Sequence, residues 1–222
     1  MTLKRFEVYN LMYNTGVVPL FYHPDADTAI KTLDACYKGG LRILEYTNRG
    51  PRAHEVFRHM AEHAAQQMPD MVLGVGSVVT PETSDLYIQL GAKFVVSPLL
   101  NPDMARTCNR RKVGWIPGCS TASEISRAEE LGAEVVKVYP ATLLGGPKFI
   151  KTMLAPCPWM SLMPSQGVAP TRENLTEWFD AGAFCVGMGS KIITGDILKN
   201  GRFDQLEKNM RDLLELITDI KS

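Results

Sequence analysis

Lys137 is a lysine inside a stretch that should be buried on both faces. It lies in the run VVKVYP at 135–140, which is apolar and rich in β-branched and aromatic residues, as buried strands are. An ammonium group is costly to bury, so the pKa of such a lysine falls and its neutral amine becomes a nucleophile. This pattern predicts imine formation with a carbonyl substrate. The alternative is a lysine whose aliphatic stem carries the charge past its neighbours to water.

A second charge lies in another apolar run, RILEYT at 42–47, which contains Glu45. Burial raises the pKa of a carboxyl group and suits it to proton transfer near neutral pH. Arg49 follows four residues later, where the predicted strand ends. The alternatives are an ordinary ion pair between Glu45 and Arg49, and Arg49 as a charge on a loop. A lysine, a carboxylate and an arginine at strand ends together favour a catalytic site.

Charge and composition exclude several other classes of protein. The 222 residues contain 24 Lys and Arg against 24 Asp and Glu, so a strongly basic nucleic-acid surface is not expected. Five widely spaced cysteines favour reduced thiols, and the N-terminus shows no secretory pattern, so we expect a cytoplasmic protein. No apolar run approaches the ~20 residues of a membrane span. We expect neither a nucleic-acid nor a membrane partner.

The elements that must position these residues alternate between short apolar runs and amphipathic stretches. Helices end at Gly-Gly or Gly-Ala pairs before the strands and begin at Thr, Asn or Pro caps. The predicted strands are 17–22, 42–47, 71–78, 94–97, 113–116, 135–139, 161–163 and 184–187. The predicted helices are 3–13, 27–38, 52–67, 81–90, 101–110, 122–131, 146–154, 172–181 and 203–220.

Eight strand–helix units at even spacing predict an α/β protein, a (β/α)₈ TIM barrel with an extra N-terminal helix. No linker interrupts the chain, so we expect one domain over residues 1–222. A doubly wound open sheet is the alternative. In a barrel the active site lies where the strands end, and the small, glycine-containing loops after strands seven and eight favour an anion there. We expect no metal and no cofactor: His54, His59 and His63 lie on one predicted helix without an acidic partner at fitting spacing.

Several of these motifs together are similar to those of the bacterial 2-keto-3-deoxy-6-phosphogluconate (KDPG) and 4-hydroxy-2-oxoglutarate (KHG) aldolases, over nearly the whole chain. The motifs are LEYTNR at 44–49, GVGSV at 74–78, SP at 97–98, IPGCST at 116–121, KVYP at 137–140 and GMGS at 187–190. The resemblance implies a class I, pyruvate-forming lyase of carbohydrate metabolism, including the Entner–Doudoroff route. It also implies a homotrimer that acts on a small 2-keto acid and needs no metal.

The resemblance also implies roles for individual residues. Lys137 would be the Schiff-base lysine, and Glu45 would move protons through a water molecule. Arg49 and Ser77 would hold the substrate carboxylate. The remaining expected substrate-binding residues would wall the reacting carbons (Pro98 and Tyr139) or bind a distal phosphate (Ser165, Gln166, Gly167, Gly187, Gly189 and Ser190).

One loop departs from the family pattern. The family commonly reads PTGG after strand seven, whereas this chain reads PSQG at 164–167. Gln166 adds a bulky amide where a glycine backbone could approach phosphate, which leaves the lysine chemistry untouched but weakens the case for a phosphorylated substrate. Two other functions stay open: another phosphosugar-binding barrel, such as an isomerase or epimerase, and a barrel that binds a ligand without turnover.

Overall fold

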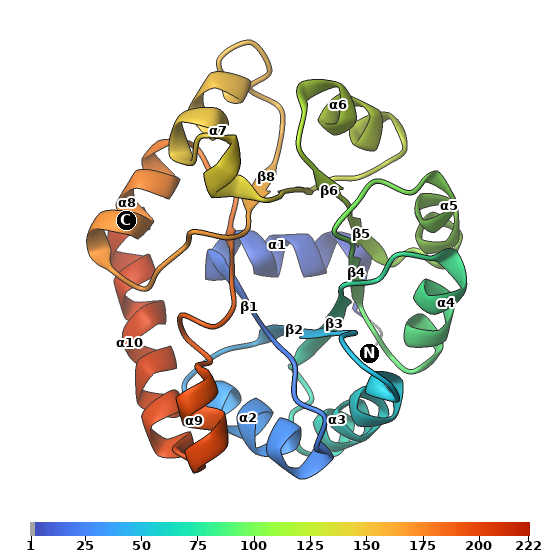
Figure 1. Cartoon of the computed structure of the whole chain (residues 1–222), viewed down its shortest axis with the longest axis vertical. Helices are drawn as coiled ribbons and strands as arrows, with labels where there is room; N and C mark the ends of the chain where they lie inside the picture. Colours follow the sequence, from blue (N-terminus) through green and yellow to red (C-terminus); the bar gives the residue numbers. More distant parts are fainter. Residues whose placement is uncertain (1–2) are drawn as a thin grey trace.

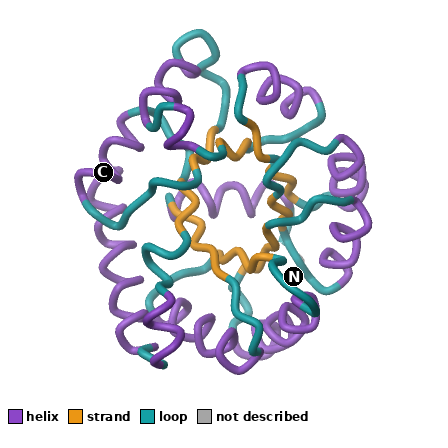
Figure 2. Tube along the Cα trace, viewed as in Figure 1, coloured by secondary structure: helices purple, strands orange, loops and turns teal. Residues whose placement is uncertain are grey.

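Parallel strands form a ring at the centre of the molecule, and helices surround it (Figures 1 and 2). This computed structural model describes residues 3–222, so the first two residues of the predicted domain lie outside the described part. The (β/α)₈ barrel and the extra N-terminal helix predicted from the sequence are confirmed. The elements in chain order are α1 (Arg5–Thr15), β1 (Val17–Phe21), α2 (Ala26–Lys38), β2 (Ile43–Thr47), α3 (Ala53–Gln67), β3 (Val72–Gly76), α4 (Pro81–Gln89), β4 (Phe94–Val96), α5 (Pro102–Arg111), β5 (Gly114–Ile116), β6 (Gly118–Cys119), α6 (Ala122–Glu130), β7 (Val136–Val138), η1 (Ala141–Leu144), α7 (Pro147–Leu154), β8 (Leu162–Pro164), α8 (Arg172–Asp180), β9 (Val186–Met188), α9 (Gly195–Asn200) and α10 (Phe203–Lys221).

The ring consists of two hydrogen-bonded sheets, with the orders β5-β4-β3-β2-β1-β9 and β6-β7-β8. Strands β5 and β6 are two halves of one barrel strand, divided at Pro117, which has no N–H to donate to a sheet. The first half pairs with β4 and the second with β7. On the other side, a bridge between Ser165 and Gly187 joins β8 to β9. Eight barrel strands result, as predicted, although the fifth was expected to end at Ile116, so its second half, β6, was not predicted.

Inward and outward side chains alternate along the strands. Val136 and Val138 pack outward with the helices, whereas Val135 packs inward in a second apolar cluster. Because strand side chains alternate with a period of two, Lys137 shares the inward face with Val135. The inward cluster also contains Tyr9 and Met12 of α1, which close the end of the barrel where the strands begin. The loops that carry the predicted site residues lie at the opposite end.

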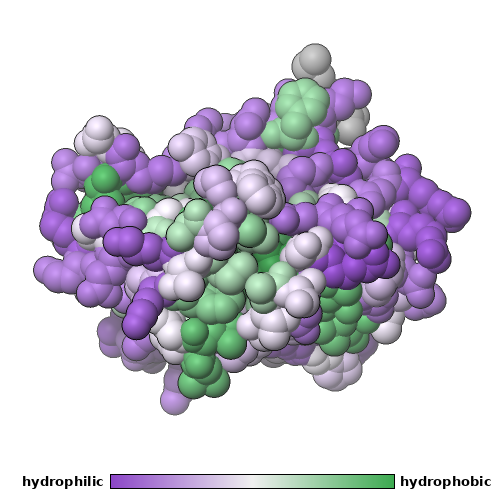
Figure 3. Space-filling view, turned by 90° about the horizontal axis from the view of Figure 1, so that it is seen from above, coloured by the Kyte–Doolittle hydropathy of each residue, from purple (hydrophilic) through white to green (hydrophobic). Residues whose placement is uncertain are grey.

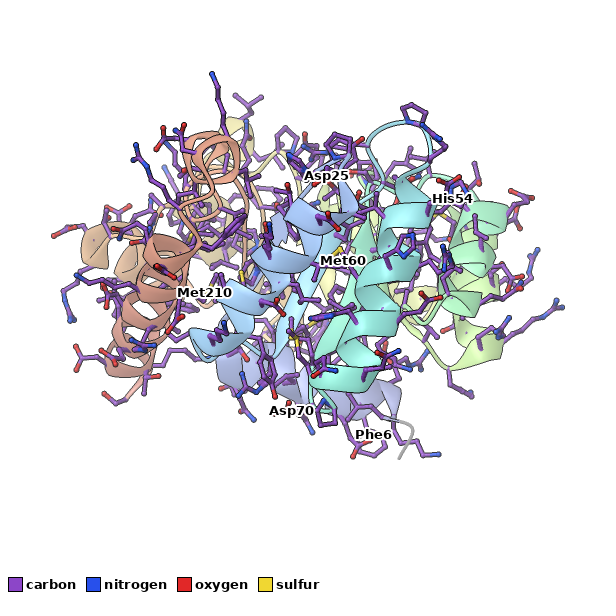
Figure 4. The ribbon with its side chains drawn as sticks, turned by 90° about the horizontal axis from the view of Figure 1, so that it is seen from below. Phe6, Asp25, His54, Met60, Asp70 and Met210 are labelled. Carbon is purple, nitrogen blue, oxygen red and sulfur yellow. The ribbon has the colours of Figure 1, made fainter. Side chains whose placement is uncertain are left out.

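The two rims of the barrel can be followed in Figure 4. Asp25 and His54, which follow β1 and β2, lie at one rim, whereas Asp70 and Phe6 lie at the other. The side chain of Asp25 caps α2 by accepting a hydrogen bond from the Thr28 backbone N–H at 2.8 Å. Side-chain caps of this kind also begin α4, α5, α6, α8 and α9, and each satisfies a backbone N–H at the start of its helix.

The predicted helix starts and stops are found at the expected places. Thr80, Asn101 and Thr171 cap α4, α5 and α8 with their side chains. Gly91 and Gly182 follow helices in the left-handed region, at φ of 110° and 94°, where a side chain would be strained. Two short elements, η1 and α9, were not predicted, because four and six residues are too few to show a helical hydrophobic period.

Candidate active site

Lys137 lies at the centre of β7 and points into the barrel. Its neighbours in register are Gly118 on β6 and Met163 on β8. The residue is only 8% exposed, so its stem does not lead the amine out to open water. Burial lowers the pKa of the ammonium group, the positive charge of Arg49 lowers it further, and the negative charge of Glu45 opposes both. The amine is therefore more nucleophilic than that of an ordinary surface lysine.

Glu45 approaches the same interior from the opposite wall. In the ring of eight barrel strands its strand, β2, lies four positions from β7, which is directly across the barrel. Glu45 is 1% exposed, and burial raises the pKa of its carboxyl group against the attraction of Lys137 and Arg49. Within residues 3–222 its Oε2 atom has no hydrogen-bond partner. A buried oxygen without a partner is suited to hold a water molecule or a substrate hydroxyl.

Arg49 and Ser77 lie together at the ends of β2 and β3. The Nε atom of Arg49 donates to the Ser77 hydroxyl at 3.2 Å. Among the described residues Arg49 forms no ion pair, so the simple pairing with Glu45 that the sequence also allowed is not found. Most of its guanidinium donors are left for a ligand, and their planar arrangement suits a carboxylate.

Tyr139 lies beside Lys137, and Pro98 lies in the exposed loop after β4. Tyr139 is 39% exposed, and its ring centre lies 5.2 Å from the Nζ atom of Lys137. The backbone of Pro98 lies so close to Gly118 that a Cβ on that glycine would be 2.5 Å from the Pro98 carbonyl. Strand β6 therefore approaches the Pro98 loop more closely than any side chain at position 118 would permit.

A cavity of about 570 Å³ opens beside these residues at the same rim. It brings together eight of the predicted site residues from four separate loops. They are Arg49, Tyr139, Ser165, Gln166, Gly167, Gly187, Gly189 and Ser190. The other four predicted residues, Lys137, Glu45, Ser77 and Pro98, do not line this cavity. Lys137 and Glu45 are buried deeper in the barrel.

Gln166 takes an unusual conformation in this wall. Its φ of 82° lies in the left-handed region, which glycine occupies more readily. The hydroxyl of Thr142, in η1, donates to the Gln166 side-chain oxygen at 3.0 Å. Gly167 packs tightly on the same threonine, because an added Cβ would lie 1.9 Å from its methyl carbon. Gln166 is thus tied to η1, and its amide NH₂ is left to donate elsewhere.

Sequence reasoning did not find Thr142 or Lys191. Lys191 follows Ser190 directly and lines the cavity. The sequence did contain a signal for Lys191, which is a cation next to the glycines of β9 and the loop that follows it. Thr142 had no such signal, because only the folded chain brings η1 against the loop that follows β8. The described residues lining this cavity include two cations, Arg49 and Lys191, and no carboxylate.

A metal centre has no counterpart in the described part of the chain. No three His, Cys, Asp or Glu side chains within residues 3–222 are grouped as a metal site requires. One histidine of α3, His63, pairs with Asp34 at 2.7 Å. Nor does any helix in these residues have the length and apolar character needed to cross a membrane.

Comparisons with known proteins show the family of this chain and support its fold. The family model for KDPG and KHG aldolases matches residues 8–209, and the chain belongs to this family of class I pyruvate aldolases, which are lyases. A 2-dehydro-3-deoxy-phosphogluconate aldolase of Pseudomonas aeruginosa is 31% identical over 96% of this chain and 94% of its own length. One of Haemophilus influenzae is 28% identical over 98% and 100%.

A solved structure shares the fold. The KDPG aldolase of Legionella pneumophila, with pyruvate captured as a covalent carbinolamine, superimposes with a TM-score of 0.83 at 24% identity. The match covers 92% of this chain and 97% of that one.

Proposed function

We propose that this protein cleaves a 2-keto-3-deoxy sugar acid, such as KDPG, to pyruvate and an aldehyde, which would be glyceraldehyde 3-phosphate for KDPG, and that it also accepts 4-hydroxy-2-oxoglutarate. Lys137 is the Schiff-base residue. The observation that carries the proposal is the meeting of Lys137 and Glu45 in the barrel interior from opposite walls, with pKa values shifted in opposite directions. Both shifts favour the neutral forms, which suits a lysine that attacks a carbonyl and a carboxyl that exchanges protons.

The reaction follows from these two groups. The Nζ atom of Lys137 attacks C2 of the keto acid to give a carbinolamine, which loses water to form a protonated imine. Glu45, through a water molecule, removes the proton of the C4 hydroxyl. The C3–C4 bond then breaks, its electrons pass into an enamine, and the aldehyde leaves. Protonation at C3 and hydrolysis of the imine release pyruvate and free Lys137. The carbinolamine captured in the Legionella protein supports the first step.

The carboxylate of the substrate binds Arg49 and Ser77. Their side chains are already joined at 3.2 Å, so little ordering is needed when the anion arrives. Pro98 and Tyr139 wall the reacting carbons, and the ring of Tyr139 beside the Lys137 amine limits access of water to the imine.

The distal end of the substrate occupies the cavity beyond Tyr139. Ser165, Gln166 and Gly167 of the seventh loop and Gly187, Gly189 and Ser190 of the eighth bind it there. Lys191 supplies a positive charge in the same wall, so a second anionic group on the substrate is favoured. Because Gln166 fills part of this wall, phosphate is selected less strongly than the glycine-rich family loop would select it.

The whole chain acts as one domain, forms a homotrimer and works in the cytoplasm. Exposed apolar side chains such as Leu143 and Trp159 support an assembly, and Figure 3 shows hydrophobic clusters between hydrophilic stretches of one face. The five cysteines are free, which fits a reducing compartment. Sedimentation of the purified protein tests the trimer: a monomer would contradict it.

The cleavage activity is tested by following pyruvate release from KDPG and from 4-hydroxy-2-oxoglutarate. We expect pyruvate release from at least one of these substrates, and a chelator should not reduce it. The release should be lost in Lys137→Met, a variant that keeps the apolar stem of the side chain. The matched control is Lys148→Met, because Lys148 is an exposed lysine on nearby α7. Activity that a chelator abolishes and a metal ion restores, or activity that survives in Lys137→Met, would contradict the proposal.

A further inference from the structure

Gly76, the last residue of β3, lies where the carboxyl group of Glu45 needs room. A Cβ atom at position 76 would be 1.6 Å from Oε1 of Glu45 and 2.4 Å from its Cδ. No side chain can tolerate such distances, and the group that would have to move is the buried carboxyl end of Glu45 rather than a surface side chain. The carboxyl group therefore occupies the space that any other residue at position 76 would fill.

The backbone itself does not call for a glycine at this position. The φ angle of Gly76 is not in the left-handed region. The residue pairs in regular parallel register with Thr47 of β2. Any L-residue can adopt this conformation. Glycine in a strand interior usually weakens the strand, and it often marks a place where another group approaches closely. Here the approaching group is Glu45.

The other inward glycine of β3 has a different neighbour. A Cβ on Gly74 would lie 2.3 Å from the ring of Phe94, which belongs to the apolar cluster at the closed end of the barrel. Gly74 thus makes room for packing, whereas Gly76, two residues nearer the open rim, makes room for a carboxyl group. The two glycines leave the inner side of β3 bare along this length.

We propose that Gly76 is a positioning residue: by having no side chain, it lets the Glu45 carboxyl group lie across β3 and face the Lys137 amine inside the barrel. The proposal rests on the proton-transfer role proposed above for Glu45. A side chain at position 76 would drive the carboxyl group away from this place without touching Lys137 or Arg49. Proton transfer should then fail while imine formation survives.

The first test is Gly76→Ala. We expect kcat for cleavage to fall by about 10²-fold or more, which is the scale of a lost acid–base group, with KM changed little. Borohydride trapping of pyruvate should persist, with its pH profile moved in the same direction as in Glu45→Gln. Val75→Ala is the matched control on the same strand, because Val75 packs outward; it should lose stability and keep kcat within about threefold. Wild-type kcat in Gly76→Ala would overturn the proposal.

The second test is the Glu45→Ala/Gly76→Ala double variant. Once the carboxyl group is gone, the added methyl group has room, so the double variant should match Glu45→Ala in kcat and exceed Gly76→Ala in melting temperature. If Gly76→Ala does not fold, recovery of folding in the double variant supports the steric argument. A further loss of kcat in the double variant, or failure of both variants to fold, would overturn it.

The two proposals can fail separately. If Glu45→Ala keeps wild-type kcat, the proton-transfer role of Glu45 is wrong. The melting temperatures of the single and double variants still report whether Gly76 and Glu45 compete for one space. If they do not depend on each other, the positioning role of Gly76 is wrong whatever Glu45 does.

Discussion

At Lys137 and Glu45, burial acts on two groups of opposite charge and shifts their pKa values toward each other. The lysine is lowered and the carboxyl is raised, and each charge partly offsets the shift of the other. Such a pair can pass a proton through an intervening water with a smaller difference in free energy than two surface groups would have. The proposed chemistry therefore depends on keeping both residues buried from bulk water.

Glu45→Gln separates the two roles. We expect it to bind pyruvate as an imine but to cleave substrate about 10²–10⁴-fold more slowly, since the amide cannot exchange a proton. The Glu45 charge raises the pKa of Lys137, so its removal lowers that pKa. Trapping needs the neutral amine and rises with pH, so the half-maximal pH should move down. Trapping rate against pH and single-turnover cleavage measure both effects; a cleavage rate near wild type would leave Glu45 with a structural role only.

Gln166→Gly tests the distal end of the site. Glycine fits the φ of 82° without strain and exposes the loop backbone to an incoming phosphate. A charge-assisted hydrogen bond is worth roughly 1.5–3 kcal/mol, so preference for a phosphorylated substrate should rise by about 10- to 100-fold. The measurement is kcat/KM for phosphorylated and unphosphorylated 2-keto-3-deoxy sugar acids.

Thr142→Val is the control for this change, because it removes the 3.0 Å hydrogen bond to Gln166 and keeps the glutamine. A glycine variant that prefers phosphate no more strongly than wild type would mean that the Gln166 amide itself donates to the phosphate.

Among the elements, the ones that the sequence predicted poorly are those whose shape depends on distant contacts. The fifth barrel strand resumes after Pro117 because its second half pairs with β7, a contact that no local pattern records. The helices η1 and α9 are too short for a hydrophobic period, yet η1 carries Thr142 against the seventh loop. By contrast, the long amphipathic helices and the buried strands were predicted because their periodicity is local.

Helix α1 should stabilise the barrel without taking part in catalysis. Met12 is fully buried in the cluster that closes the end of the barrel. Met12→Ala should lower the free energy of unfolding by about 2–5 kcal/mol, the usual cost of a large-to-small change in a core, and leave kcat unchanged. Phe6→Ala on the same helix is the control, since Phe6 is 65% exposed. Denaturant unfolding of both variants is the measurement. A fall in kcat with unaltered stability would link α1 to the active site instead.

For the whole molecule, the sequence predicted the fold and the burial of Lys137 and Glu45, but not every residue that lines or supports the cavity wall. Eight repeated units with glycine stops predict a barrel, and a barrel sends the ends of all its strands to one rim. Lys137 and Glu45 could be found because a charge within an apolar run is visible locally. Lys191, Thr142 and the space at Gly76 could not, because their importance comes from which other chain segment lies against them.

The central claim is that Lys137 forms a covalent imine with a 2-keto acid inside the barrel. The most direct measurement is incubation of the intact protein with pyruvate and borohydride, followed by intact mass and peptide mapping. The account predicts one reduced pyruvyl group per chain, located on Lys137 and absent from Lys137→Met. No adduct, or an adduct on Lys148 or Lys151 of the neighbouring helix α7, would contradict it.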